Sequence, residues 1–269
     1  MSTTTFPLPA GHHAGGDALP RGWRACSRLL GFFALCLFEV AEWITVVWVP
    51  GHSQCHQARA AWLSRFCRRL VALFGIEAVY RGRPPATGLL VCNHLSYLDV
   101  IVLAARAPLT FVAKSDIRGW PGLGPLFCCA GTLFVNRERR GDVARTGAEM
   151  KAALAGGTSL CVFAEGTSSD GTRVLPFRSS LLAPAVEHGC PVTPAWIGYE
   201  LEEGSAAEEV CYWGDMTFGP HLLNLLGHRR IRARVCYGAP EEAAGDRKAL
   251  AARLHAEVCR LGEVDPTWP

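Results

Sequence analysis

The sequence predicts an α/β fold: a mixed, largely parallel sheet flanked by helices, preceded by an N-terminal pair of membrane-associated helices. From residue 76 onward, short apolar stretches of strand length alternate with amphipathic stretches of helix length, which is typical of an α/β domain. The 269 residues are 49% apolar and only 19% charged, and the mean hydropathy is +0.15. Such a chain can bury a large core, so it is not disordered as a whole. Its shortage of charge indicates a segment that meets lipid.

Residues 1–21 are rich in Thr, Pro, Gly and His and show no periodicity, so we expect a flexible tail. No basic segment followed by a short apolar stretch and a cleavage site is visible there, so no cleavable signal peptide is expected. The 12 cysteines are scattered through apolar runs without paired C-x-x-C spacing. We therefore expect mostly buried thiols in a reducing compartment.

Residues 22–75 are expected to form the two membrane-associated helices. The run from Leu29 to Val49 has 21 residues interrupted only by Glu39 and Glu42, which is about 30 Å of helix. Two acids near its middle are costly in hydrocarbon. We therefore favour a helix that dips into one leaflet or pairs with its neighbour; a full transmembrane span and a buried soluble helix are the alternatives.

A second helix is expected from about residue 55 to residue 74. Its large apolar residues fall on one arc, and three arginines occupy a neighbouring arc: Trp62, Leu63, Phe66, Leu70 and Leu73, then Arg65, Arg68 and Arg69. A basic, Trp-bearing amphipathic helix can lie at an anionic lipid surface, and we favour that arrangement. The alternative is a helix that packs this arc into the core.

The α/β domain is expected over residues 76–269. Strands are predicted at 88–92, 109–113, 132–135, 158–164 and 191–197, and helices at about 97–106, 142–155, 179–188 and 246–261. No internal repeat is present.

The segment Asn93-His94-Leu95-Ser96-Tyr97-Leu98-Asp99 stands where the strand 88–92 ends and a helix should begin, and strand ends of this kind commonly carry ligand sites. Ser96 and Asp99 have the spacing of a helix cap, which is a purely structural explanation for both. Two residues five apart inside a helix point away from each other, so His94 can meet Asp99 only from the loop before the helix. There Asp99 would hold Nδ1–H, leaving Nε2 to take a proton from a substrate hydroxyl.

A second polar turn, Glu165-Gly166-Thr167-Ser168, directly follows the strand 158–164, and it could be an ordinary surface turn. Three arginines stand near strand ends: Arg137, Arg173 and Arg178. Because guanidinium groups bind phosphate through two hydrogen bonds, these three could hold an anionic head group.

Four blocks occur in a fixed order along the chain: Asn93-His94-x4-Asp99, Gly131-x2-Phe134-Val135-x-Arg137, Phe163-x-Glu165-Gly166-Thr167 and Pro191-Val192-x-Pro194. In the order and spacing of these four blocks, the chain resembles the lysophosphatidate (1-acyl-glycerol-3-phosphate) acyltransferase family. The resemblance covers about residues 60–240. The resemblance implies an α/β domain seated on a membrane by the preceding helices. It also implies transfer of a fatty acyl group to the sn-2 hydroxyl of 1-acyl-glycerol-3-phosphate, giving phosphatidate for phospholipid biosynthesis.

The resemblance implies a role for each matching residue. His94 would be the base and Asp99 its orienting partner, while Arg137 would contact the phosphate of the acceptor. The acceptor site would be shaped by Asn93, Glu165, Gly166 and Thr167. The co-substrate would be acyl-CoA or the thioester of acyl carrier protein, so we expect no metal and no further cofactor. The expected partners are the bilayer and the lysolipid, at the cytoplasmic face of a bacterial inner membrane.

One departure concerns the third block. Family members that use lysophosphatidate commonly have Arg after Glu-Gly-Thr, whereas this chain has Ser168; Arg173 and Arg178 could compensate. The segment FAEGTSSDGTRVLPFRSSLL also resembles a bacterial subgroup that includes lyso-ornithine lipid acyltransferases. Lyso-ornithine lipid or another lysolipid is therefore an alternative acceptor. A lipid-binding membrane protein without catalysis is the alternative from another class.

Other classes of protein are disfavoured by the residues present. The chain has no Gly-x-Ser-x-Gly elbow, so a serine hydrolase is not expected. Cys92 ends an apolar strand, so we expect it to be buried rather than nucleophilic. The net charge of +3 comes without a nucleic-acid-binding motif, so no nucleic acid is expected as a partner.

Overall fold

The computed structural model describes residues 20–120, 123–136 and 140–263, so most of the predicted tail lies outside the described residues. Within them, eight strands form one sheet in the order β1-β7-β6-β2-β5-β3-β4, with β8 beside β6. The strands are β1 (Ile76–Arg81), β2 (Gly88–Cys92), β3 (Thr110–Lys114), β4 (Leu133–Val135), β5 (Ser159–Phe163), β6 (Pro191–Leu201), β7 (Ile231–Tyr237) and β8 (Glu241–Glu242). Neighbours run parallel except β6 with β7 and β6 with β8. The predicted mixed, largely parallel sheet is confirmed.

The central strands β2 and β5 run through the interior of the protein. Every residue of β2 is buried, which explains why its sequence is a continuous apolar run rather than an alternating one. The register pairs Cys92 at the end of β2 with Phe163 at the end of β5. His94 and Glu165 each follow two residues later, so parallel pairing brings them to the same edge of the sheet.

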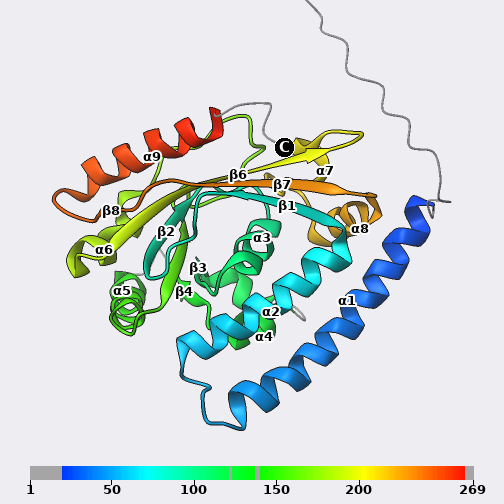
Figure 1. Ribbon diagram of the computed structural model, residues 1–269, viewed down its shortest axis with the longest axis horizontal. Coiled ribbons are helices and arrows are strands. Elements are labelled where there is room, and N and C mark those ends of the chain that lie inside the picture. Colours follow the sequence, from blue (N-terminus) through cyan, green and yellow to red (C-terminus); the bar gives the residue numbers. More distant parts are fainter. Residues whose placement is uncertain (1–19, 121–122, 137–139, 264–269) are drawn as a thin grey trace, which may run out of the picture.

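Helices cover both faces of this sheet. One face carries α2 (His56–Phe74), α3 (Leu98–Arg106) and α8 (Phe218–Gly227), and the other carries α5 (Arg140–Ala155), α6 (Ala183–His188) and α9 (Arg247–Glu263). Figure 1 shows α9 and α3 on opposite sides of the sheet. Shorter elements complete the chain: η2 (Ser115–Gly119), α4 (Leu123–Cys129), η3 (Ser179–Leu181) and α7 (Ala206–Glu209). The helix expected at 179–188 is thus a 3₁₀ turn followed by α6.

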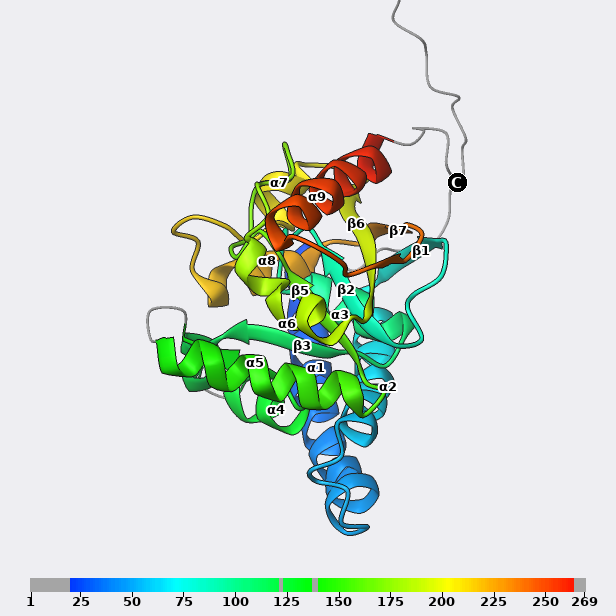
Figure 2. The ribbon, with the colours of Figure 1, turned by 90° about the vertical axis from the view of Figure 1, so that its left-hand side faces the viewer.

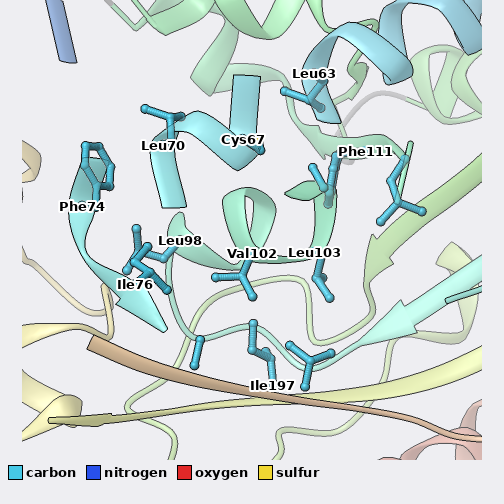
Figure 3. Close-up of a cluster of buried hydrophobic side chains, with 14 of the residues drawn as sticks. Leu63, Cys67, Leu70, Phe74, Ile76, Leu98, Val102, Leu103, Phe111 and Ile197 are labelled. Atoms are coloured by element: carbon cyan, nitrogen blue, oxygen red, sulfur yellow. The ribbon is translucent and has the colours of Figure 1, made fainter. Parts of the chain in front are cut away.

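The apolar arc of α2 lies in the core. Trp62, Leu63, Phe66 and Leu70 are all buried. Figure 3 shows Leu63, Cys67 and Leu70 on the side of α2 that faces Leu98 and Val102 of α3. The prediction that this arc lies at a lipid surface is therefore wrong, because α3 and the sheet offer it a packed partner. The helix ends where Gly75 takes a left-handed conformation, with φ of 69°, which favours glycine.

The first helix has a different environment. The helix α1 (Arg21–Trp43) continues into the π-helical turn η1 (Ile44–Trp48), and together they form 28 residues that are long and apolar enough to cross a membrane. Many of their large apolar side chains are exposed: Trp23, Leu30, Phe33, Leu37, Phe38, Val40, Ile44, Val46 and Trp48. In Figures 1 and 2 the turn between η1 and α2 projects beyond the rest of the fold.

The two acids of α1 point toward α2. Arg65 donates from Nε to Glu42 at 2.7 Å, and Arg69 forms ion pairs with both Glu39 and Glu42. Glu39 is completely buried. Of the four arrangements considered from the sequence, α1 therefore pairs with its neighbour, and its acids lie away from the exposed apolar face.

Candidate active site

Asn93 connects the end of β2 to β6. Its side-chain Oδ1 accepts from the Ile197 N–H at 2.8 Å, and its Nδ2 donates to the Ile197 carbonyl at 2.9 Å. The side chain thus continues the pairing of β2 with β6 for one more step, and it is 2% exposed. Asn93 was expected to bind substrate, but its amide is used to hold the following loop in place.

His94 lies in that loop, before the first turn of α3. Its Nδ1 is 2.8 Å from Oδ2 of Asp99, and because a carboxylate only accepts hydrogen bonds, Nδ1 carries the proton. The ring stacks on Phe163 at the end of β5, with centroids 4.0 Å apart. The Nε2 atom makes no hydrogen bond to another described residue, and the side chain is 22% exposed. The predicted pairing of His94 with Asp99 is present.

Asp99 is completely buried and accepts four hydrogen bonds. Its Oδ2 receives Nδ1–H of His94 and the backbone N–H groups of Leu95 and Ser96, at 2.7 and 3.1 Å. Its Oδ1 receives the Tyr199 hydroxyl at 2.7 Å. Four donors satisfy both oxygens of a buried group that would be costly to leave without hydrogen bonds.

The predicted helix cap at Ser96 is only half formed. The carboxylate of Asp99 reaches back to the Ser96 N–H, but the Ser96 hydroxyl is buried without a partner among the described residues. The helix begins at Leu98 with Tyr97 as its first flanking residue. Asp99 turns toward the loop because His94 and two backbone amides attract it there.

Glu165 lies beside the pair of His94 and Asp99, and it is 3% exposed. Burial raises the pKa of its carboxyl group to about 8, and the nearby charge of Asp99 acts in the same direction. The backbone N–H groups of Leu175 and His94 oppose this shift of the pKa, but neither carboxyl oxygen has a well-formed hydrogen bond within the described part of the chain. Glu165 therefore holds a proton at neutral pH, while Asp99 is surrounded by donors.

The turn after Glu165 carries the remaining polar groups of the third block. Gly166 has φ of 79°, a left-handed conformation that lets the chain turn away from β5. Thr167 is exposed. Ser168 donates its hydroxyl to the carbonyl of Tyr212, so it links the turn to the loop before α8. The backbone N–H of Ser169 also donates to the carbonyl of His94, at 3.0 Å.

The three predicted arginines have different positions. Arg178 donates from Nε to the backbone carbonyl of Glu165 at 3.2 Å, so it supports the turn instead of pairing with the carboxylate. Arg173 is exposed and lines a cavity of about 470 Å³ at the edge of the sheet, next to Asn93, Leu95 and Tyr199. Arg137 lies outside the described residues.

The structure adds residues that the motifs did not indicate. Tyr199 enters from β6, and its only sequence signal is the strand period of two, which places residues 195, 197 and 199 on one face. Phe163 belongs to the third block, but its stacking on His94 depends on the pairing of β2 with β5. Cys92 is completely buried, and burial raises the pKa of its thiol well above the usual value. This agrees with a structural role for that cysteine.

The chain matches the Acyltransferase family over residues 75–198. A lyso-ornithine lipid O-acyltransferase from Brucella abortus is 38% identical over 216 residues, which cover 74% of this chain and 81% of that protein. A 1-acyl-sn-glycerol-3-phosphate acyltransferase from Neisseria meningitidis is 30% identical, over 66% of this chain and 71% of that protein.

The fold has a solved counterpart in a 1-acyl-sn-glycerophosphate acyltransferase from Thermotoga maritima. Its crystal structure is 19% identical, has a TM-score of 0.61, and covers 90% of this chain and 99% of that one. At this identity the similarity concerns the fold alone. The resemblance carried by the four blocks is confirmed by the sequence relatives, and with 38% identity to the Brucella protein over 74% of this chain and 81% of that protein the chain belongs to the acyltransferase family.

Proposed function

We propose that this acyltransferase moves a fatty acyl group from a thioester donor to the hydroxyl of a lysolipid, with lyso-ornithine lipid as the acceptor. The observation that carries the chemistry is the contact between His94 Nδ1 and Asp99 Oδ2, at 2.8 Å. It orients an imidazole whose second nitrogen is available at the edge of the sheet. The proposed donor is acyl-CoA or acyl carrier protein, with no further cofactor.

In the proposed mechanism, His94 is the general base. Nε2 takes the proton of the acceptor hydroxyl as its oxygen attacks the thioester carbonyl carbon. When the tetrahedral adduct collapses, the C–S bond breaks, and the departing sulfur takes this proton from the imidazolium. Asp99 keeps the ring oriented and stabilises the imidazolium. Because a thioester is already activated, no covalent enzyme nucleophile is needed.

Glu165 supports this mechanism by remaining neutral. The charge of Asp99 acts on Glu165, so a second negative charge on Glu165 would be repelled. With its pKa raised to about 8, Glu165 adds no second negative charge beside Asp99 at neutral pH. Its protonated carboxyl group can also donate a hydrogen bond to an acceptor oxygen.

The proposed acceptor depends on the third block. Ser168 stands where lysophosphatidate enzymes of the family commonly have an arginine, and its hydroxyl is used by the Tyr212 carbonyl. The name of the Brucella relative favours lyso-ornithine lipid. Arg173, which lines the cavity next to Asn93 and Leu95, is proposed to meet the acidic part of the head group.

Lysophosphatidate, the acceptor that the four blocks indicated first, is the second candidate. The Neisseria relative carries that name at 30% identity, and Arg137, which the resemblance assigned to the phosphate, is present in the sequence. Glycerolipid and ornithine-lipid acceptors share a free hydroxyl next to an acyl chain, so the proposed chemistry at His94 is the same for both.

We propose that α1 and η1 contact lipid and that the protein works, as expected from its sequence, at the cytoplasmic face of the membrane. Leu30, Leu37 and Val49 are 71%, 76% and 67% exposed, and they belong to an apolar surface that is unusual for a soluble protein. Arg65 and Arg69 hold the acids of α1 against α2, so the apolar face of α1 can enter hydrocarbon without carrying Glu39 and Glu42 into it.

The test is an acyl-transfer assay with detergent-purified protein. Labelled acyl-CoA and acyl carrier protein are each offered with lyso-ornithine lipid and with 1-acyl-glycerol-3-phosphate. We expect the higher kcat/KM with lyso-ornithine lipid; a preference for the phosphate acceptor would select the second candidate. His94→Ala should lower kcat by about a hundredfold or more, and His188→Ala, which alters an exposed histidine of α6, should have no effect. Transfer by His94→Ala at the wild-type rate would refute the mechanism.

A further inference from the structure

The two oxygens of the Asp99 carboxylate are held by different parts of the chain. All three donors to Oδ2 come from residues 94–96, which lie directly before the helix of Asp99. The donor to Oδ1 is the hydroxyl of Tyr199 on β6, at 2.7 Å and 100 residues away in sequence. We propose that Tyr199 is a positioning residue for acyl transfer, acting through Asp99 on the orientation and charge of His94. This inference rests on the mechanism proposed above.

The geometry explains what the hydroxyl adds. Residues 94–96 are neighbours of Asp99 in sequence, so their donors fix the carboxylate relative to its own segment, and that loop is itself tied to the sheet through Asn93. Tyr199 belongs to the central sheet, where β6 pairs with β2 through Leu89 and Val192. Its hydrogen bond therefore fixes the plane of the carboxylate relative to the sheet edge at which the substrate must lie.

The hydroxyl is also the donor that keeps Oδ1 from being an unpaired, buried anionic oxygen. Burial, followed by the charge of Asp99, raises the pKa of Tyr199 well above its usual value, so the phenol remains a donor over the whole range of an activity assay. A hydrogen bond to a charged acceptor is stronger than one between neutral groups. Without it, the charged form of Asp99 loses a quarter of its donors.

Several titratable groups face Asp99 from the elements around it. The nearest are the imidazole of His94 in the loop, the hydroxyl of Tyr199 on β6 and the carboxyl group of Glu165 after β5. Three thiols complete the set: Cys92, Cys161 and Cys211. Burial raises the pKa of each thiol and of Glu165, so none of these four adds a negative charge in slightly acidic assays.

The pH dependence separates positioning from simple packing. Loss of the Tyr199 hydroxyl leaves Oδ1 of Asp99 without its donor, which weakens the arrangement in which the carboxylate holds Nδ1–H of His94 and Nε2 is available to accept a proton. Protons compete with this arrangement more strongly as the pH falls. The acidic limb of the pH–rate profile should therefore move to higher pH when the hydroxyl is removed.

The experiment compares Tyr199→Phe with Tyr80→Phe. Tyr80 is a matched control because it also lies in the core and loses one hydroxyl, which donates to the Val102 carbonyl at 2.9 Å and not to a carboxylate. We expect Tyr199→Phe to lower kcat by roughly tenfold to a hundredfold, to change KM by less than about twofold, and to move the acidic limb upward. Tyr80→Phe should lower thermal stability by less, because its acceptor is a neutral carbonyl, and it should leave the profile in place.

The outcomes separate this inference from the proposed function. If His94→Ala abolishes transfer and Tyr199→Phe keeps the wild-type kcat and profile, Tyr199 is not a positioning residue although the mechanism stands. If both tyrosine variants lower kcat equally without moving the acidic limb, the effect is one of stability, and the inference fails. If His94→Ala itself keeps full activity, the mechanism fails first.

Discussion

Replacing Glu165 by glutamine is expected to stabilise the protein at high pH and to leave its stability nearly unchanged at low pH. The pKa of this carboxyl group rises from 4.5 to about 8 on folding, mainly because burial disfavours its charged form. Between these values the folded chain binds a proton that the unfolded chain has released. The free energy of unfolding therefore falls as the pH rises from about 4.5 to about 8. Above that range the full cost of burying the charged Glu165 carboxylate is present.

The magnitude follows from the same difference. At about 1.4 kcal/mol for each unit of pKa, a rise from 4.5 to about 8 corresponds to a penalty on the order of 5 kcal/mol. This is a large part of the usual stability of a domain. Glutamine has the shape of the protonated acid and cannot ionise, so the variant avoids this penalty. The two proteins should be about equally stable at pH 5 and should differ by several kcal/mol at pH 9.

The assay is denaturant unfolding in detergent micelles at pH 5, 6, 7, 8 and 9, with the difference in unfolding free energy plotted against pH. Glu203→Gln is the matched control, because Glu203 makes the same chemical change at an exposed position, in the bend after β6. The curve for Glu165→Gln should rise with pH, and the curve for the control should stay flat. If the difference in unfolding free energy between Glu165→Gln and the wild type is the same at pH 5 and at pH 9, the reasoning is refuted. Glu165 would then be charged in the folded protein over this whole range.

Three further predictions concern other parts of the structure. Asn93→Ala removes both bonds to Ile197 and leaves a buried N–H and C=O unpaired, so it should cost about 2–4 kcal/mol of unfolding free energy; a loss below 0.5 kcal/mol in denaturant titration would contradict that role. Ser168→Arg should raise kcat/KM for 1-acyl-glycerol-3-phosphate relative to lyso-ornithine lipid in a competition assay, and an unchanged ratio would remove residue 168 from head-group selection. Leu30→Ser combined with Leu37→Ser should reduce binding to anionic vesicles in a sedimentation assay while thermal stability is kept; full retention in the pellet would count against α1 as the lipid contact.

The vesicle-binding test changes α1 and not α2, because the sequence alone did not show which of the two helices packs on the core. The amphipathic pattern of α2 suits a lipid surface and a protein core equally well, because both environments favour the same apolar arc. Trp62 and Phe66 are buried against the rest of the fold, so removal of residues 1–75 would expose the core as well as remove α1. Point substitutions on the exposed face of α1 avoid this problem.

The sequence by itself determined the α/β class and the pairing of His94 with Asp99. Both depend on short-range physics: strands and helices alternate with recognisable periods, and a histidine in a loop can meet a carboxylate in the following turn of helix. The same local signals predicted the apolar helix before the sheet, and the four blocks indicated the family.

Only the tertiary structure decided what surrounds this pair. The contact between Tyr199 and Asp99 joins residues 100 positions apart, and it exists because β6 lies beside β2 in the sheet. Glu165 lies beside His94 because β2 and β5 pair with Cys92 opposite Phe163, and its raised pKa follows from the burial that this pairing produces. Local spacing can place a functional group on a strand or a loop, but the charge and the orientation of that group depend on neighbours that only strand order and register bring to it.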